Sequence, residues 1–235
     1  MLAWIILLPL IGFAFSILFG KKLPKPLVGF IASVVVLGSF LFSIDVFNTV
    51  SADPNGISER LFTFLAIDGF NVSFTLFADR ITSIMLLVIT GVGLLIHVYS
   101  ISYMSHDEGF YKFFAYLNLF VFNMLILVLG SNLLVLFFGW EGVGLCSYLL
   151  IGFWYQNPSF GKAARKAFIM NRIGDLGLLL AIFLCAIYVG SFEFSVISNA
   201  AQSGALPEHL ITTISILLFV GAMGKSAQIP LYTWL

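Results

Sequence analysis

The residues that could do chemistry are a few charges embedded in apolar sequence. Glu141 lies in the run from Leu133 to Tyr155, which is long enough to cross a bilayer, and Lys225 lies in a second apolar segment. An acidic side chain at the centre of a membrane helix costs about 2.5 to 3.5 kcal/mol on insertion scales, so it is kept where it is paired, hydrated or protonated for use. We expect Glu141 and Lys225 to be partners in proton movement.

Two further charges, Arg172 and Asp175, support this hypothesis. At 1.5 Å per residue, Glu141, Asp175 and Lys225 lie about 12, 18 and 22 Å from the outer surface of a membrane core about 30 Å thick. Ionisable groups at similar depth on three helices suit a hydrated proton path. A structural interpretation stays open: Glu141 and Lys225 could only hold two helices together, and Arg172 and Asp175 could compensate each other at i,i+3.

Other polar residues in apolar segments could extend a water path: His97, Asn118, Asn123, Ser147 and Gln228. For His97 a structural or interfacial role is the alternative, and for the two asparagines it is hydrogen bonding between helices.

Cysteine and histidine usage predicts no metal site and no redox centre on this chain. Cys146 and Cys185 lie in apolar segments without CxxC spacing, and the three histidines are far apart.

Composition indicates the element type that positions these charges. Of the 235 residues, 60% are hydrophobic and 9% are charged, whereas soluble domains carry about 25% charged residues. The chain is therefore an all-α integral membrane protein. Because each span needs about 20 apolar residues, we expect seven membrane helices, near residues 2–19, 27–47, 81–101, 113–130, 133–155, 167–190 and 210–230. The net charge of zero gives no bias towards nucleic acid.

The segments between these spans define three parts. Residues 1–47 form the N-terminal membrane helices, which we interpret as retained rather than as a signal peptide, because no basic residue precedes the apolar stretch. Residues 48–80 form an extracytoplasmic loop in which Phe62–Leu65 and Val72–Leu76 flank the turn residues Asp68–Gly69, the pattern of a β-hairpin. Residues 81–235 form the membrane part that carries the charges, with loops at 156–166 and 191–208.

The last span is interrupted by proline. Pro230 removes a backbone donor and clashes with the carbonyl of residue 226, so the helix should break just after Lys225. A broken membrane helix exposes backbone polar groups, which are tolerated only against protein or a water-filled cavity. We therefore expect Lys225 to border a wet site.

Basic residues predict the orientation. With the first loop in the cytoplasm, seven lysines and arginines lie on that side and two on the other, so the N-terminus is extracytoplasmic. The seven are Lys21, Lys22, Lys25, Lys112, Lys162, Arg165 and Lys166, and the two are Arg60 and Arg80.

Three motifs make the pattern specific. The segments Gly139–Trp154 (GWEGVGLCSYLLIGFW), Ala167–Asp175 (AFIMNRIGD) and Gly224–Leu231 (GKSAQIPL) resemble the NADH dehydrogenase subunit 5 family of respiratory complex I, called chain L in bacteria. This family is related to the large subunit of Mrp-type sodium/proton antiporters. The resemblance implies an antiporter-like first repeat in which Glu141 and Lys225 are the proton-translocating pair, with Arg172 and Asp175 as supporting charges.

The resemblance also implies the assembly. The chain would be a membrane-arm subunit of a proton-translocating NADH-quinone oxidoreductase in the bacterial inner membrane, with flavin, iron–sulfur clusters and quinone in partner subunits. Family members continue beyond the residues that match Lys225, through a second repeat and a lateral helix, so 235 residues would hold most of one half-channel. Two alternatives stay open: an Mrp-like cation/proton antiporter subunit without redox partners, and a structural part of the membrane arm that transports nothing.

Overall fold

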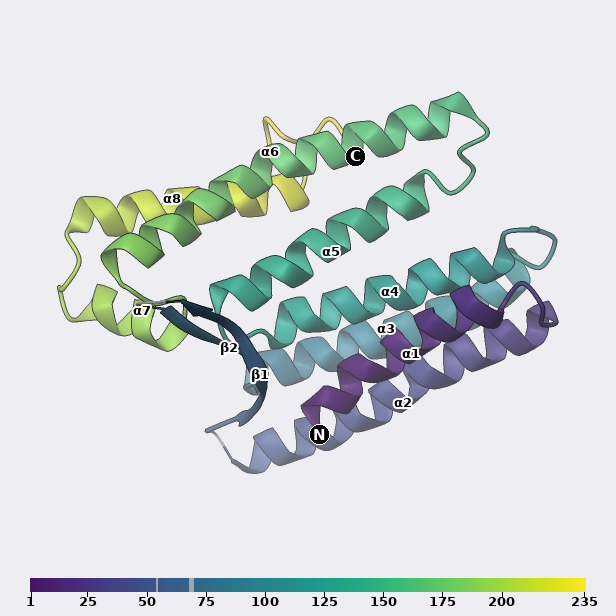
Figure 1. The fold of residues 1–235 in the computed structure, drawn as a ribbon, viewed down its shortest axis with the longest axis horizontal. Helices are drawn as coiled ribbons and strands as arrows, with labels where there is room; N and C mark the ends of the chain where they lie inside the picture. The colour runs from purple at the N-terminus through teal and green to yellow at the C-terminus, as the bar shows by residue number, and fades with distance from the viewer. Residues whose placement is uncertain (54, 68–69) are drawn as a thin grey trace. The chain divides into compact units, whose positions relative to one another are not determined.

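The computed structural model describes residues 1–53, 55–67 and 70–235. Over these residues the chain forms eight helices and one two-stranded antiparallel hairpin (Figure 1). Seven of these helices are long and apolar enough to cross a membrane, which confirms the predicted architecture. They are α1 (Leu2–Phe19), α2 (Lys25–Ala52), α3 (Arg80–Tyr103), α4 (Phe110–Leu129), α5 (Leu133–Ile151), α6 (Pro158–Tyr188) and α8 (Glu208–Lys225).

The first compact unit comprises residues 1–61 and 75–130 and contains α1 to α4. Helix α2 packs against α1 and α3, and α4 packs against α1 and α3. The buried face of α2 repeats at helical spacing, with Val28, Ala32 and Val36 one turn apart and each at most 1% exposed.

The second compact unit comprises residues 62–74 and 131–235 and contains α5 to α8. Helix α6 packs against both α5 and α8. Glycines let α6 and α8 approach backbone to backbone, since a Cβ added at Gly174 would lie 2.8 Å from the Cα of Gly224. The next residue on each helix, Asp175 and Lys225, is thereby brought to the same level of the unit.

The predicted hairpin is confirmed and its strands are longer than the sequence pattern indicates. Strand β1 covers Ile57–Ile67 and β2 covers Phe70–Ala78, and the expected turn at Asp68–Gly69 lies outside the described residues. Burial alternates along β2, where Val72, Phe74, Leu76 and Ala78 are buried, as expected for a strand with one packed face. Residues 57–61 and 75–78 belong to the first unit, and the rest of the hairpin belongs to the second.

Two predicted loops contain helix. The predicted loop at 156–166 is wrong, because α6 already begins at Pro158, where the side chain of Asn157 accepts a hydrogen bond of 3.0 Å from the amide of Ser159. A capping asparagine followed by proline at the first helical position favours a helix start. The predicted loop at 191–208 contains the short helix α7, Phe194–Gln202. An apolar count cannot detect helix that continues beyond the hydrocarbon layer or lies outside it.

The end of α8 follows the prediction that the helix breaks just after the lysine. The helix ends at Lys225, five residues before Pro230, and Ala227 adopts a positive φ of 50°. The amide of Gln228 then donates to the carbonyl of Met223 at 3.0 Å. The interruption therefore starts at Ser226 rather than at the proline itself.

Candidate functional site

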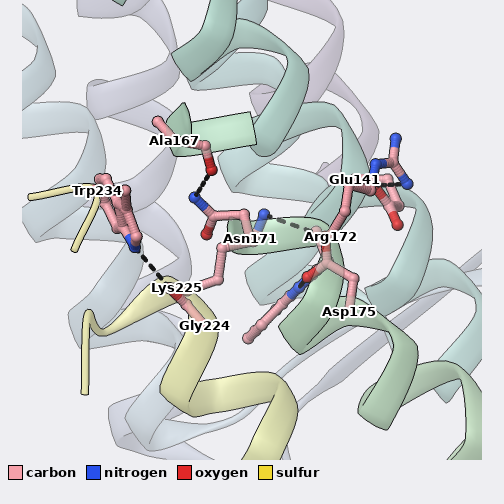
Figure 2. Close-up of polar contacts among 9 residues, drawn as sticks. Glu141, Ala167, Asn171, Arg172, Asp175, Gly224, Lys225 and Trp234 are labelled. Atoms are coloured by element: carbon pink, nitrogen blue, oxygen red, sulfur yellow. Dashed lines mark hydrogen bonds and ion pairs between the residues drawn. The ribbon is translucent and has the colours of Figure 1, made fainter. Parts of the chain in front are cut away.

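Four charges from three helices meet within the second unit, three of them buried or partly buried and one exposed. Glu141 comes from α5, Arg172 and Asp175 from α6, and Lys225 from the last residue of α8 (Figure 2). On α6 the two charged residues are three positions apart, so they lie on the same face of the helix. The structure thus brings together the four charges that the sequence analysis singles out.

The ion pairs within this group differ from the predicted partners. The Nη1 of Arg172 contacts the Oε2 of Glu141, and the Nζ of Lys225 lies 3.8 Å from the Oδ2 of Asp175. The direct pairing of Glu141 with Lys225 and the local compensation of Arg172 by Asp175 are therefore both replaced by pairs that cross from α6 to α5 and to α8. Depth along a helix predicts which charges share a level, but the direction in which each side chain points decides the partner.

The four charges balance, with two carboxylates against two cations. Arg172 is 47% exposed, whereas Glu141, Lys225 and Asp175 are 18%, 20% and 5% exposed. The guanidinium of Arg172 also lies 4.9 Å from the ring centroid of Phe168, within the range of a cation–π contact. Because arginine stays protonated in proteins, Arg172 provides Glu141 with a permanent counter-charge, and Lys225 is the cation that can give up its proton.

The ammonium of Lys225 occupies space left by a glycine. A Cβ at Gly144 on α5 would lie 2.8 Å from Nζ. Among the described residues, Nζ has no hydrogen-bond partner, and the same holds for Glu141 Oε2 and Asn171 Oδ1. Of these three atoms, Glu141 Oε2 and Lys225 Nζ each face an ion-pair partner, whereas Asn171 Oδ1 has none among the described residues. A buried polar atom costs about 1–3 kcal/mol unless it is hydrated or paired.

Two further side-chain hydrogen bonds lie near the site, one within α6 and one to the end of α8. The Nδ2 of Asn171 donates to the carbonyl of Ala167 at 2.8 Å, and the Nε1 of Trp234 donates to the carbonyl of Gly224 at 3.0 Å (Figure 2). The second hydrogen bond satisfies a carbonyl in the last turn of α8, where no helical partner follows. The interrupted segment after α8 therefore folds back on the lysine-bearing end of the helix.

Sequence reasoning missed Trp140. Its Nε1 donates a 2.5 Å hydrogen bond to the Oδ1 of Asp175, and its ring centroid lies 5.6 Å from the Nζ of Lys225. The available signal was its position next to Glu141 in an apolar helix, because a buried indole N–H needs an acceptor and hydrocarbon offers none.

Three of the predicted path residues, His97, Asn118 and Asn123, belong to the first unit. The Nδ1 of His97 is 2.8 Å from the carbonyl of Gly93, and its ring lies edge-on to Phe114. The side-chain amides of Asn118 and Asn123 each donate to a carbonyl one turn earlier on α4. These two bonds stay within α4.

The remaining two path residues lie in the second unit. Ser147 is half-buried on α5, one turn after Gly144, and Gln228 is exposed in the segment after α8. Their part in a water path stays a prediction.

Two family models match the chain. The model described as "NADH:quinone oxidoreductase/Mrp antiporter, TM" matches residues 130–235, and the model described as "NADH-Ubiquinone oxidoreductase (complex I), chain 5 N-terminus" matches residues 64–114. The first match contains all four charged residues of the site.

Curated relatives agree with these models. NADH-quinone oxidoreductase subunit L of Campylobacter jejuni is 47% identical over 97% of this chain and 36% of its own length. The Escherichia coli protein of the same name is 43% identical over 100% of this chain and 39% of its own length. NADH-ubiquinone oxidoreductase chain 5 of Marchantia polymorpha is 42% identical over 98% of this chain and 36% of its own length. The chain thus spans a little over a third of the length of these relatives.

Two solved structures share the fold. The Mrp complex from Dietzia sp. matches with a TM-score of 0.85 and 24% identity, covering 100% of this chain and 24% of that chain. The membrane-bound sulfane sulfur reductase, an archaeal respiratory membrane complex, matches with a TM-score of 0.80 and 25% identity. The match covers 98% of this chain and 34% of that chain. The family itself is identified by the two family models and the curated relatives: over residues 64–114 and 130–235 the chain matches the NADH:quinone oxidoreductase/Mrp antiporter membrane subunits.

Proposed function

We propose that the chain is the proton-translocating part of a membrane-arm subunit of an NADH-quinone oxidoreductase, with Lys225 as the group that takes up and releases the proton. The observation that carries this proposal is the balanced group of four charges in the membrane-spanning part of one unit. Such groups are expensive in hydrocarbon and mark ion and proton pathways. A purely structural ion pair would be as stable with apolar replacements, so stability alone gives no reason to keep four charges.

The geometry suggests a role for each charge. Glu141 has Arg172 as a permanent counter-ion, whereas Lys225 faces Asp175 across 3.8 Å, beyond hydrogen-bonding distance. A small movement, or one water molecule between them, would complete a proton path from Lys225 to Asp175. In this account Glu141 and Arg172 set the field in which Lys225 gains or loses its proton, and a change in their pairing biases that equilibrium.

The curated relatives support NADH-quinone oxidoreductase as the assembly in which this proton transfer takes place. The names of the Campylobacter and Escherichia proteins identify them as subunits of NADH-quinone oxidoreductase. By extension, this chain would lie in the bacterial inner membrane with its N-terminus extracytoplasmic, beside other membrane subunits. Electron transfer, with flavin, iron–sulfur clusters and quinone, would take place in partner subunits and drive charge rearrangement along the membrane arm.

A second candidate function is that of an Mrp-like cation/proton antiporter subunit. It is favoured by the TM-score of 0.85 against the Mrp complex over the whole of this chain. Both functions need a buried lysine that titrates, so the site does not separate them. Purification of the native assembly does: partner subunits that contain flavin and iron–sulfur clusters support the first function, and an assembly of membrane subunits alone supports the second.

Substitution of the two charges tests proton translocation. Glu141→Gln and Lys225→Ala should each depress proton pumping, while the assembly still oxidises NADH with an artificial electron acceptor. The retained NADH oxidation controls for assembly of the redox subunits. Normal pumping in both variants at normal protein levels would show that these charges are structural.

A further inference from the structure

Trp140 contacts both partners of the Asp175–Lys225 pair. Its indole N–H donates to the Oδ1 of Asp175 at 2.5 Å, and its ring centroid lies 5.6 Å from the Nζ of Lys225. Both contacts are to charged groups, and both arise from one rigid side chain. An indole that only filled space between helices would need neither.

The hydrogen bond from Trp140 engages one carboxylate oxygen of Asp175 and leaves the other oxygen to face Lys225. The side chain of Asp175 is 5% exposed, and among the described residues the Trp140 indole is the donor within hydrogen-bonding distance of it. With Oδ1 engaged by the indole, Oδ2 is the oxygen that faces Lys225, at 3.8 Å. A carboxylate held by one oxygen cannot rotate away from the ammonium without breaking a hydrogen bond to an ionised group, which is stronger than a neutral one.

Trp140 and Glu141 are neighbours in α5 and contact different charged residues of α6. Successive residues of an α-helix point about 100° apart, so Trp140 and its neighbour Glu141 face different directions. Glu141 contacts Arg172, while Trp140 contacts Asp175, the next charge on the same face of α6. One turn of α5 therefore contacts both charges on α6.

We propose that Trp140 is a positioning residue for proton transfer: it holds Asp175 so that the free carboxylate oxygen faces Lys225. This inference rests on the proposed function, since it assigns a role within the same site. Trp140 itself carries no proton in the transfer. Its contribution is to keep the acid oriented and the lysine close while the proton moves.

Trp140→Phe tests the proposal, because it removes the indole N–H and keeps an aromatic ring. Proton transport by the native assembly should fall about tenfold, the scale of one hydrogen bond to an ionised group. Trp154→Phe is the matched control: Trp154 belongs to the same unit, is 44% exposed and packs against Phe160. It should transport protons at the wild-type rate.

A double-mutant cycle with Asp175→Asn separates positioning from packing. If Trp140 acts through the carboxylate, Trp140→Phe should add no further loss of transport on the Asp175→Asn background. Losses that multiply, or wild-type transport by Trp140→Phe, would overturn the proposal. These results differ from failure of the proposed function, in which Lys225→Ala would itself transport normally.

A spectroscopic measurement covers the case in which Trp140→Phe does not assemble. The ultraviolet resonance Raman band that reports indole N–H hydrogen bonding should include a strongly bonded contribution from Trp140, beside that of Trp234, whose Nε1 donates to the carbonyl of Gly224. Asp175→Ala should weaken that band, because the acceptor is gone. An unchanged band would contradict the contact on which the proposal depends.

Discussion

Replacing Gly144 with alanine should push directly on the ammonium of Lys225. The new Cβ would lie 2.8 Å from Nζ, whereas ordinary contacts begin at 3.4 Å, so the ammonium must retreat by at least the difference, 0.6 Å. Nζ is the end of a flexible side chain, and it is the only neighbour within 4 Å of that Cβ among the described residues. The strain should therefore fall on the site while the fold survives.

The expected effect follows from the size of this displacement. A retreat of 0.6 Å is comparable to the gap between the present Lys225–Asp175 distance of 3.8 Å and a hydrogen bond of about 3 Å. Since a misplacement of about 1 Å can cost about a hundredfold in rate, we expect proton transport to fall about tenfold. The amount of assembled protein should not fall, because alanine is the better helix former by about 1 kcal/mol.

The assay is proton uptake into membrane vesicles that carry the native assembly, measured with a pH-sensitive dye and normalised to the amount of this chain. Gly161→Ala is the matched control, because Gly161 lies on α6 in the same unit and a Cβ there meets no atom within 4 Å. Wild-type transport by Gly144→Ala, or an equal loss in Gly161→Ala, would refute the reasoning.

Three further substitutions test contacts that stabilise the fold. Gly174→Ala places a Cβ 2.8 Å from the Cα of Gly224, and since backbone cannot yield like a side chain, it should destabilise the fold by about 1–3 kcal/mol; an unchanged thermal midpoint in detergent would contradict this. Asn132→Ala removes the cap of α5, where the side chain accepts from the amides of Leu134 and Val135, and should cost about 1 kcal/mol by the same measurement. Burial opposes the ionisation of Glu59, but hydrogen bonds from the N-terminal ammonium and the Ala3 amide outweigh it and hold its pKa below the ordinary value of 4.5. A lowered folded-state pKa gives a stabilisation that is present above the ordinary pKa and is lost as the pH falls through the folded-state value. The gap in thermal midpoint between the wild type and Glu59→Gln should therefore shrink between about pH 7 and about pH 3; a constant gap would show that the charge of Glu59 contributes nothing.

The membrane helices could be predicted from the sequence because apolar length is a direct requirement of the bilayer. The break after Lys225 was equally accessible, since Pro230 forbids a regular helix there. Helix α7 and the first turns of α6 were not accessible in this way. These segments mix polar and apolar residues and are too short to count as spans, so only a local cue such as the Asn157 cap distinguishes helix from loop there.

For the site, the sequence predicted the members but not the contacts. Glu141, Arg172, Asp175 and Lys225 are conspicuous because charge is rare in these segments. Which of them form ion pairs depends on how each helix is rotated about its axis and on the close approach of Gly174 and Gly224 between α6 and α8. Counting residues along each span predicts neither. Trp140 was overlooked because aromatic residues are common in membrane helices, and only the direction of its N–H towards Asp175 reveals a role.

Proton transport by Lys225→Ala in the native assembly, compared with the wild type at equal protein level, decides whether Lys225 takes up and releases the proton. Proton uptake should be abolished or reduced at least tenfold, while NADH oxidation with an artificial acceptor continues. Proton uptake at the wild-type rate would contradict this role of Lys225, because the one cation in the site that can release its proton would then be dispensable.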